Sequence, residues 1–135
     1  WNIMCWLRKI NVNLNDYKGE QIQYWFELKD IANSTAQSKL VSLNVDTIDP
    51  VIVDLNYTII SKSVQFKINI TEDHFDSVQY FDSNDANPKW KKLCSTLKNN
   101  MCSVKKSFSL GNHDLSIQVI DEAGNTVAEG VSFII

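Results

Sequence analysis

The side chains with the most definite covalent chemistry in this 135-residue chain are its three cysteines. Cys94 and Cys102 are eight positions apart (102 − 94 = 8) and flank a polar stretch. That spacing suits a disulfide that closes a short loop between two strands, and such a bridge indicates an oxidising, extracellular compartment. The alternative is three reduced, buried thiols in a cytosolic protein. Cys5 is left over: either it is a free thiol, or its partner lies outside this sequence.

Acidic and amide side chains near turns form the second group, because Ca²⁺ takes hard oxygen ligands in sets of six to eight. Asp46 and Asp49 lie in the extended segment before Pro50, where calcium would stiffen a joint between two domains. Asp121 and Asn125 more often bond the backbone amides of their own turn. The two interpretations are therefore a calcium site at Asp46 and Asp49, or turn hydrogen bonds throughout.

Three Asn-x-Ser/Thr sequences fit the acceptor pattern for an N-linked glycan: Asn33, Asn56 and Asn69. A chain with this content of Asn, Ser and Thr holds about two such matches by chance, so chance is the alternative. His74 and His113 are each alone in a turn, without a second ligand at zinc spacing. No nucleophile-elbow glycines accompany them, so we expect neither a cofactor nor an enzyme.

Tryptophans are the candidates for an interaction surface. Trp25 falls on the polar side of an alternating segment, where its ring would stack on a sugar, contact another subunit, or be covered by a neighbouring domain. In a contact between protomers, Trp1 and Trp6 would join it. We expect Trp90 to lie in the core or to cover the bridge between Cys94 and Cys102.

Composition restricts the class of protein. A hydrophobic content of 44% with 21% charged residues is typical of a globular chain. The net charge of -3 offers no basic surface for a nucleic acid. No apolar run approaches the roughly 18 residues that span a bilayer, so we expect no transmembrane segment.

Apolar and polar residues alternate with a period of two along most of the chain, which predicts strands rather than helices. From residue 49 onward, turn-forming residues separate seven short strands, at 51–57, 63–71, 76–81, 89–94, 101–109, 114–121 and 126–135. Short strands with turns between them indicate an all-β, antiparallel two-sheet sandwich over 49–135.

An internal repeat sets the size of the folding unit. Two segments about 90 residues apart share a pattern, in which Trp1, Cys5 and Asp30 correspond to Trp90, Cys94 and Asp121. The tryptophans are 89 positions apart (90 − 1) and the aspartates 91 (121 − 30). Residues 1–48 then supply only the C-terminal strands of a further sandwich, at 1–5, 7–14, 21–29 and 39–46. Because half a sandwich buries too little apolar surface, its missing strands come from preceding sequence or another molecule.

Two short motifs carry a resemblance to a known family. Asp121-Glu122-Ala123-Gly124-Asn125 and Val45-Asp46-Thr47-Ile48-Asp49-Pro50 resemble the turns and linkers of Ig-like repeats in large surface proteins of bacteria and archaea, of the stalk, adhesin or S-layer type. The set Trp90, Cys94 and Cys102 looks like an archaeal variant. The segment Asp30-Ile31-Ala32-Asn33 departs from the motif because it lacks the glycine.

This resemblance implies one complete Ig-like domain, preceded by part of another, in an extracellular tandem array that acts as a spacer or scaffold. Its partners would be neighbouring Ig-like domains. One alternative is a filament or pilus-like subunit whose half-domain is completed by strands of an identical protomer. The other alternative is a carbohydrate-binding or adhesin module that contacts surface glycans through exposed aromatic rings.

Overall fold

The chain divides into two compact units between Thr47 and Ile48. The structure is a computed structural model, and it describes residues 12–135. The boundary lies one residue from the one predicted by sequence. That the first unit is part of a further sandwich stays a prediction.

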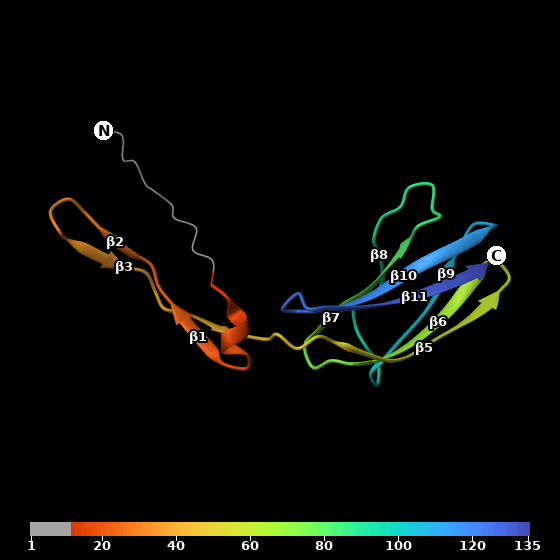
Figure 1. The fold of residues 1–135 in the computed structure, drawn as a ribbon, viewed down its shortest axis with the longest axis horizontal. Coiled ribbons are helices and arrows are strands. Elements are labelled where there is room, and N and C mark those ends of the chain that lie inside the picture. The colour runs from red at the N-terminus through yellow and green to blue at the C-terminus, as the bar shows by residue number, and fades with distance from the viewer. Residues whose placement is uncertain (1–11) are drawn as a thin grey trace. The chain divides into compact units, whose positions relative to one another are not determined.

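The C-terminal unit consists of two antiparallel sheets (Figure 1). Its strands are β5 (Val51–Ile60), β6 (Ser63–Thr71), β7 (Phe75–Asp82), β8 (Lys91–Cys94), β9 (Met101–Ser107), β10 (Asn112–Asp121) and β11 (Thr126–Ile134). One sheet has the order β5-β6-β9 and the other the order β11-β10-β7-β8. The all-β sandwich predicted from the alternation is therefore confirmed, and all seven strands lie where the sequence placed them, within a few residues at each end.

Alternation of side chains places the core between the two sheets. On β6, Val64, Phe66, Ile68 and Ile70 are all fully buried, whereas the residues between them are not. From the other sheet, Leu115, Ile117 and Val119 of β10 complete the same cluster. Burial of these two faces against each other is the main favourable contribution to folding of this unit.

The predicted disulfide is present and joins the two sheets. Cys94 ends β8 in one sheet and Cys102 lies on β9 in the other, with their Cα atoms 6.0 Å apart. Asn99 and Asn100 make the turn before β9 with φ of 50° and 60°, a left-handed conformation that asparagine tolerates better than most residues. The bridge closes a loop of eight positions, which in the chain-entropy description stabilises the fold by about 2–3 kcal/mol.

The described part of the N-terminal unit is a short 3-10 turn followed by an interrupted hairpin. Its elements are η1 (Leu14–Tyr17), β1 (Gln21–Tyr24), β2 (Glu27–Lys29), β3 (Thr35–Gln37) and β4 (Val41–Asn44). β1 pairs with β4 and β2 with β3, both antiparallel.

Two strands predicted for this unit are wrong. The strand expected over 21–29 is broken at Trp25 and Phe26. The strand expected over 39–46 is present at 41–44, and a further strand at 35–37 is not among those predicted. The strand expected over 7–14 does not include residues 12–14, because the Asn13 side chain accepts a hydrogen bond from Asn15 N (3.2 Å) and begins the 3-10 turn instead. The strand predicted at 1–5, and the part of 7–14 up to residue 11, lie outside the described residues.

The turn that connects the strands of each hairpin shares three hydrogen bonds between the two units. Asp30 N donates to Ser34 O (3.0 Å) and Ser34 N donates to Asp30 Oδ1 (2.8 Å). The bonds between Asp121 and Asn125 are the same, at 3.2 Å and 2.8 Å. All the positions are 91 apart (121 − 30 and 125 − 34).

The same alignment explains how the turn after Asp30 forms without the glycine of the motif. Asn33 takes the place of Gly124 (124 − 33 = 91), and both have positive φ, 66° and 91°. Each also donates its N–H to the carbonyl of the aspartate three positions before it, at 3.1 Å and 3.2 Å. Asparagine adopts this left-handed conformation at modest cost, so the turn keeps its geometry without glycine.

Strand register follows the same correspondence. Leu28 pairs with Ala36 as Val119 pairs with Val127, with both offsets equal to 91. Tyr24 pairs with Val41 as Leu115 pairs with Val131, with offsets of 91 (115 − 24) and 90 (131 − 41). One residue is therefore extra in the return strand of the first hairpin, between β3 and β4.

The sandwich core yields a direct test. We expect Ile117→Ala to lower the free energy of unfolding by about 2–5 kcal/mol, because Ile117 is fully buried between the sheets. Gln118→Ala, at the next position of the same strand, is the matched control, with an expected change within about 0.5 kcal/mol. Urea denaturation measures both, and an equal loss in the two variants would contradict the assignment of the inward face.

Candidate functional site

A hollow of about 300 Å³ opens at the end of the sandwich where β7 leads into β8 and β9 leads into β10. Its lining combines aromatic, acidic and basic side chains: Tyr80, Asp82, Asp85, Ala86, Lys91, Ser107, Phe108, Ser109 and His113. This volume lies at the lower limit of typical small-molecule sites. The charged groups within it decide what chemistry it offers.

His113 and Asp82 form a buried pair in the wall of this hollow. Their exposed fractions are 5% and 3%. His113 Nδ1 lies 2.6 Å from Asp82 Oδ2, and His113 Nε2 lies 3.0 Å from the carbonyl oxygen of Ser109. The imidazole thus connects the end of β7 with the loop between β9 and β10, and its ring packs between Phe108 and Phe133 at centroid distances of 5.0 and 5.3 Å.

Geometry fixes the protons of this imidazole. A carbonyl oxygen only accepts, so Nε2 carries a proton and donates it to Ser109. Burial alone would lower the pKa of His113, but the hydrogen bonds to the Ser109 carbonyl and the Asp82 carboxylate outweigh burial and raise the pKa above its ordinary value. The raised pKa favours an imidazolium that donates from both nitrogens, to Ser109 and to Asp82.

A second ion pair lies at the rim. Lys91 donates to Asp85 Oδ2, and its ammonium also lies 5.9 Å from the centroid of the Tyr80 ring. The hydrogen bond from Lys91 lowers the pKa of Asp85, and the same bond raises the pKa of Lys91. Burial raises the pKa of the Tyr80 phenol. These pKa shifts favour a charged Asp85, a charged Lys91 and a neutral Tyr80. The ion pair and the burial of the phenol stabilise the same three forms.

The charged groups of the hollow are therefore paired with one another, His113 with Asp82 and Lys91 with Asp85. Asp82 Oδ1 accepts from Asn84 N (3.1 Å) and more weakly from Asp114 N (3.4 Å), while Oδ2 faces His113. Neither ring nitrogen of His113 is left to take a proton from a substrate. The arrangement fixes the loops at this end of the sandwich to the ends of the strands.

Sequence reasoning missed this pair, although a signal was present. His113 continues the inward parity of Leu115 and Ile117, and Asp82 continues that of Val78 and Tyr80. A polar side chain on an inward position needs a buried partner. The sequence gives no pairing of β7 with β10, however, and without that register the two side chains are simply 31 positions apart (113 − 82).

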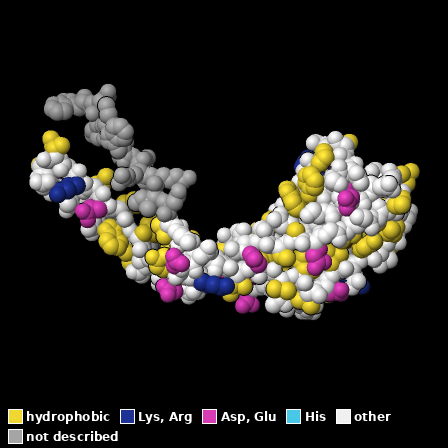
Figure 2. Space-filling model, in the orientation of Figure 1, with side chains coloured by type: hydrophobic (Ala, Val, Ile, Leu, Met, Phe, Trp, Pro, Cys, Tyr) yellow, Lys and Arg dark blue, Asp and Glu magenta, His cyan; other side chains and the backbone are white. Residues whose placement is uncertain are grey.

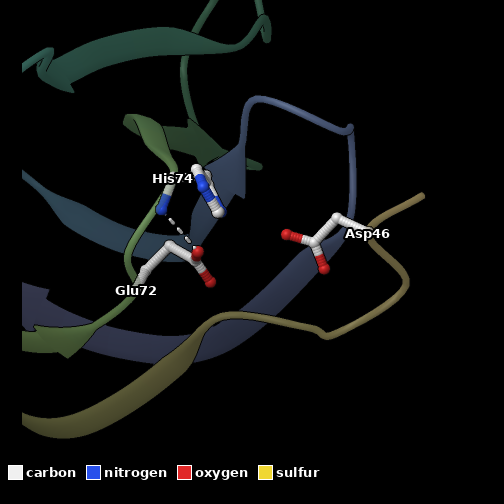
Figure 3. Close-up of side chains that lie close together, drawn as sticks. All are labelled: Asp46, Glu72 and His74. Atoms are coloured by element: carbon white, nitrogen blue, oxygen red, sulfur yellow. Dashed lines mark hydrogen bonds between the residues drawn. The ribbon is translucent and has the colours of Figure 1, made fainter. Parts of the chain in front are cut away.

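At the other end of the sandwich, local hydrogen bonds hold the turn residues that follow β6 and β10. Glu72 Oε1 accepts from His74 N (2.8 Å), as the dashed line in Figure 3 marks. Glu122 N in turn donates to His74 O (2.7 Å). Asp121, 2% exposed, accepts from the backbone and side chain of Asn125, which confirms the turn hydrogen bonds expected of these two residues.

Asp46, also drawn in Figure 3, belongs to the N-terminal unit and follows the buried Val45. Asp49 belongs to the C-terminal unit, before the buried Pro50. The calcium site at Asp46 and Asp49 stays a prediction.

Of the residues predicted to form interfaces, Trp25 is exposed (53%) in the break between β1 and β2, while Trp1 and Trp6 lie outside the described residues, as does Cys5. Trp90 is not a core residue: it is 44% exposed and packs on Phe81 with ring centroids 5.7 Å apart. Asn33 and Asn56 are exposed and Asn69 is half-buried, and glycosylation at all three stays a prediction.

No protein-family model matches the sequence, and a comparison with curated proteins finds no significant match. Within residues 12–135, no helix is both long and apolar enough to cross a bilayer. The interpretation of function therefore depends on the geometry of the two units.

The His113 pair predicts how stability depends on pH. Because the folded-state pKa is raised above the unfolded value of about 6.5, the stabilisation is complete below that pH and is lost as the pH rises through the folded-state pKa. The free energy of unfolding should fall over this window by about 1.4 kcal/mol for each unit by which the pKa is raised. Urea denaturation at a series of pH values measures it.

Two variants isolate the responsible imidazole. His113→Gln should abolish the fall, because an amide does not titrate. His74→Gln should retain the fall, because His74 is exposed. If the slope survives in His113→Gln, the buried pair is not its source.

Proposed function

We propose that this chain is an extracellular structural repeat of a bacterial or archaeal surface protein, in which Ig-like sandwich domains act as spacers or scaffolds. The observation that carries the proposal is the aspartate-anchored turn. It occurs twice, 91 residues apart, with the same two backbone–backbone hydrogen bonds, the same backbone hydrogen bond to the aspartate side chain, and corresponding strand register. A duplicated hairpin of this kind supports repetition of one domain along a polypeptide.

The disulfide supports a location outside the cell. Cys94 and Cys102 join the two sheets of the sandwich, and structural disulfides of this kind persist outside the reducing cytosol. The bridge lies at the short strand β8, which is the edge of its sheet. It thus holds an edge strand to the opposite sheet, where strand pairing alone is weakest.

Two of the four edge strands of the sandwich carry lysines, which oppose uncontrolled pairing with other chains. Lys91 and Lys92 lie on the edge strand β8, and Lys105 and Lys106 lie on the edge strand β9. Charged side chains on an edge discourage addition of a further strand. A domain with charged side chains on these two edges and a bridge between its sheets is suited to the role of a spacer.

The location of the protein in its source cells tests the proposal. We expect external protease or a membrane-impermeant label to reach the protein on intact source cells, because the proposed array stands outside the cell. We also expect Cys94 and Cys102 to be linked in the native protein, as measured by peptide mass spectrometry without reduction. A protein protected until lysis, with both thiols free, would contradict the extracellular role.

Exposure of Trp25 favours a second candidate function, an adhesin or carbohydrate-binding module. Its ring is 53% exposed, and an exposed indole face stacks well on a sugar ring. If this function is right, the chain is retained on a polysaccharide column and Trp25→Ala abolishes retention. Trp90→Ala, which removes another half-exposed indole, is the matched control and should leave retention unchanged.

A further inference from the structure

The His113 imidazole lies between two groups that only accept hydrogen bonds. Its Nδ1 faces Asp82 Oδ2 at 2.6 Å, and its Nε2 faces the Ser109 carbonyl oxygen at 3.0 Å. A carbonyl oxygen and an ionised carboxylate have no proton to donate, so both contacts are hydrogen bonds only when each ring nitrogen carries a proton. A neutral imidazole carries one proton and can therefore serve one of the two partners but not both.

Once neutral, the ring should keep its proton on the side of Asp82. A hydrogen bond to an ionised carboxylate is about twice as strong as one between neutral groups, and the Ser109 carbonyl is neutral. Asp82 is also held in place, because its Oδ1 accepts from Asn84 N at 3.1 Å. With the proton on Nδ1, the neutral ring presents a lone pair to the Ser109 carbonyl, and two acceptors then face each other.

Other titratable groups near the ring do not reverse this preference. Those that face it from neighbouring elements are Tyr80 and Asp82 of β7, Asp85 of the loop after β7 and Lys91 of β8. Asp85 and Lys91 form an ion pair, and burial keeps Tyr80 neutral because it raises the pKa of the phenol. Asp114, the next residue on β10, lies on the opposite face of that strand, and the two phenylalanines that pack against the ring are uncharged. Asp82 is therefore the charge that decides which nitrogen keeps the proton.

The segment that depends on Nε2 is the loop between β9 and β10, at Ser109 and Leu110. Backbone hydrogen bonds anchor the chain on either side of it, since Phe108 N and Gly111 N donate to carbonyl oxygens at 3.0 and 3.1 Å. Hydrophobic side chains reach the surface of the C-terminal unit (Figure 2), and Leu110 is one of the most exposed, at 71%. Packing of Leu110 therefore does not hold the segment, and the hydrogen bond from His113 to the Ser109 carbonyl does.

We propose that His113 is a proton-controlled latch, in which loss of the Nε2 proton to water releases the Ser109 carbonyl and makes Ser109 and Leu110 mobile while both sheets stay folded. In the imidazolium form the latch is closed, and Ser109 forms part of the wall of the hollow. In the neutral form the hydrogen bond to Asp82 remains and that wall opens. This inference does not depend on the proposed structural role.

NMR of the ring nitrogens through the titration of His113 tests which proton leaves, on the whole 135-residue chain. We expect both nitrogens to carry a proton below the ordinary histidine pKa of about 6.5, and Nδ1 alone to carry one once the ring is neutral. Relaxation of the Cα atoms of Ser109 and Leu110 should show their order parameters falling from about 0.85 to below about 0.6 over the same titration. Asn99, in the exposed turn before β9, is the internal control and should not change with pH.

Two variants each hold the latch in one state. The side-chain nitrogen of glutamine reaches the position of Nε2, that of asparagine reaches the position of Nδ1, and neither amide titrates. In His113→Gln, which still donates to the Ser109 carbonyl, Ser109 and Leu110 should stay rigid at every pH. In His113→Asn, which still donates to Asp82, they should be mobile at every pH.

Each outcome decides the inference. A neutral ring whose proton stays on Nε2 overturns it, and so does mobility of Ser109 and Leu110 that does not change through the titration. Equal mobility of the segment in the two variants also overturns it. If either variant fails to fold, the two measurements on the unsubstituted chain still decide, because they require no substitution.

Discussion

The structure depends on one constraint: a strand with alternating apolar side chains must find a second sheet to cover its apolar face. In the C-terminal unit β6 and β10 cover each other, and their inward residues are fully buried. In the N-terminal hairpin the same alternation is present, but within residues 12–47 no second sheet lies over it. Hydrogen bonds within a hairpin do not offset the chain entropy lost on folding, so the covering sheet decides which hairpin is stable by itself.

Polar groups within the sandwich are placed where the apolar core ends. Along β10 the inward positions pass from Val119, Ile117 and Leu115 to His113, and along β7 they pass from Val78 and Tyr80 to Asp82. At that end the imidazole and the carboxylate satisfy each other, and the Ser109 carbonyl takes the second ring nitrogen. A buried charge pair is stable only when its remaining hydrogen bonds are satisfied, and here both partners have further contacts.

Sequence predicted the features that depend on local chemistry. The period of two located all seven strands of the sandwich, and the spacing of Cys94 and Cys102 predicted their bridge. It failed where the outcome depends on tertiary register, as for the pairing of His113 with Asp82. The core position expected for Trp90 is also wrong, because the ring packs at the surface on Phe81. That Trp90 covers the bridge stays a prediction. In the first unit, a local Asn13 hydrogen bond ended a strand that the alternation favoured.

The two aspartate turns share their geometry although their residues differ. Asn33 replaces Gly124, and Ser34 replaces Asn125, yet the hydrogen bonds that define the turn are the same. What both turns retain is the aspartate, whose Oδ1 accepts the backbone N–H four positions later. The carboxylate therefore fixes the chain reversal, and with it the register that brings Leu28 opposite Ala36 and Val119 opposite Val127. Register determines which face of a strand pair is apolar, and next to the turn this carboxylate contributes to that register; farther along the first hairpin, the extra residue between β3 and β4 shifts the pairing of β1 with β4 by one position.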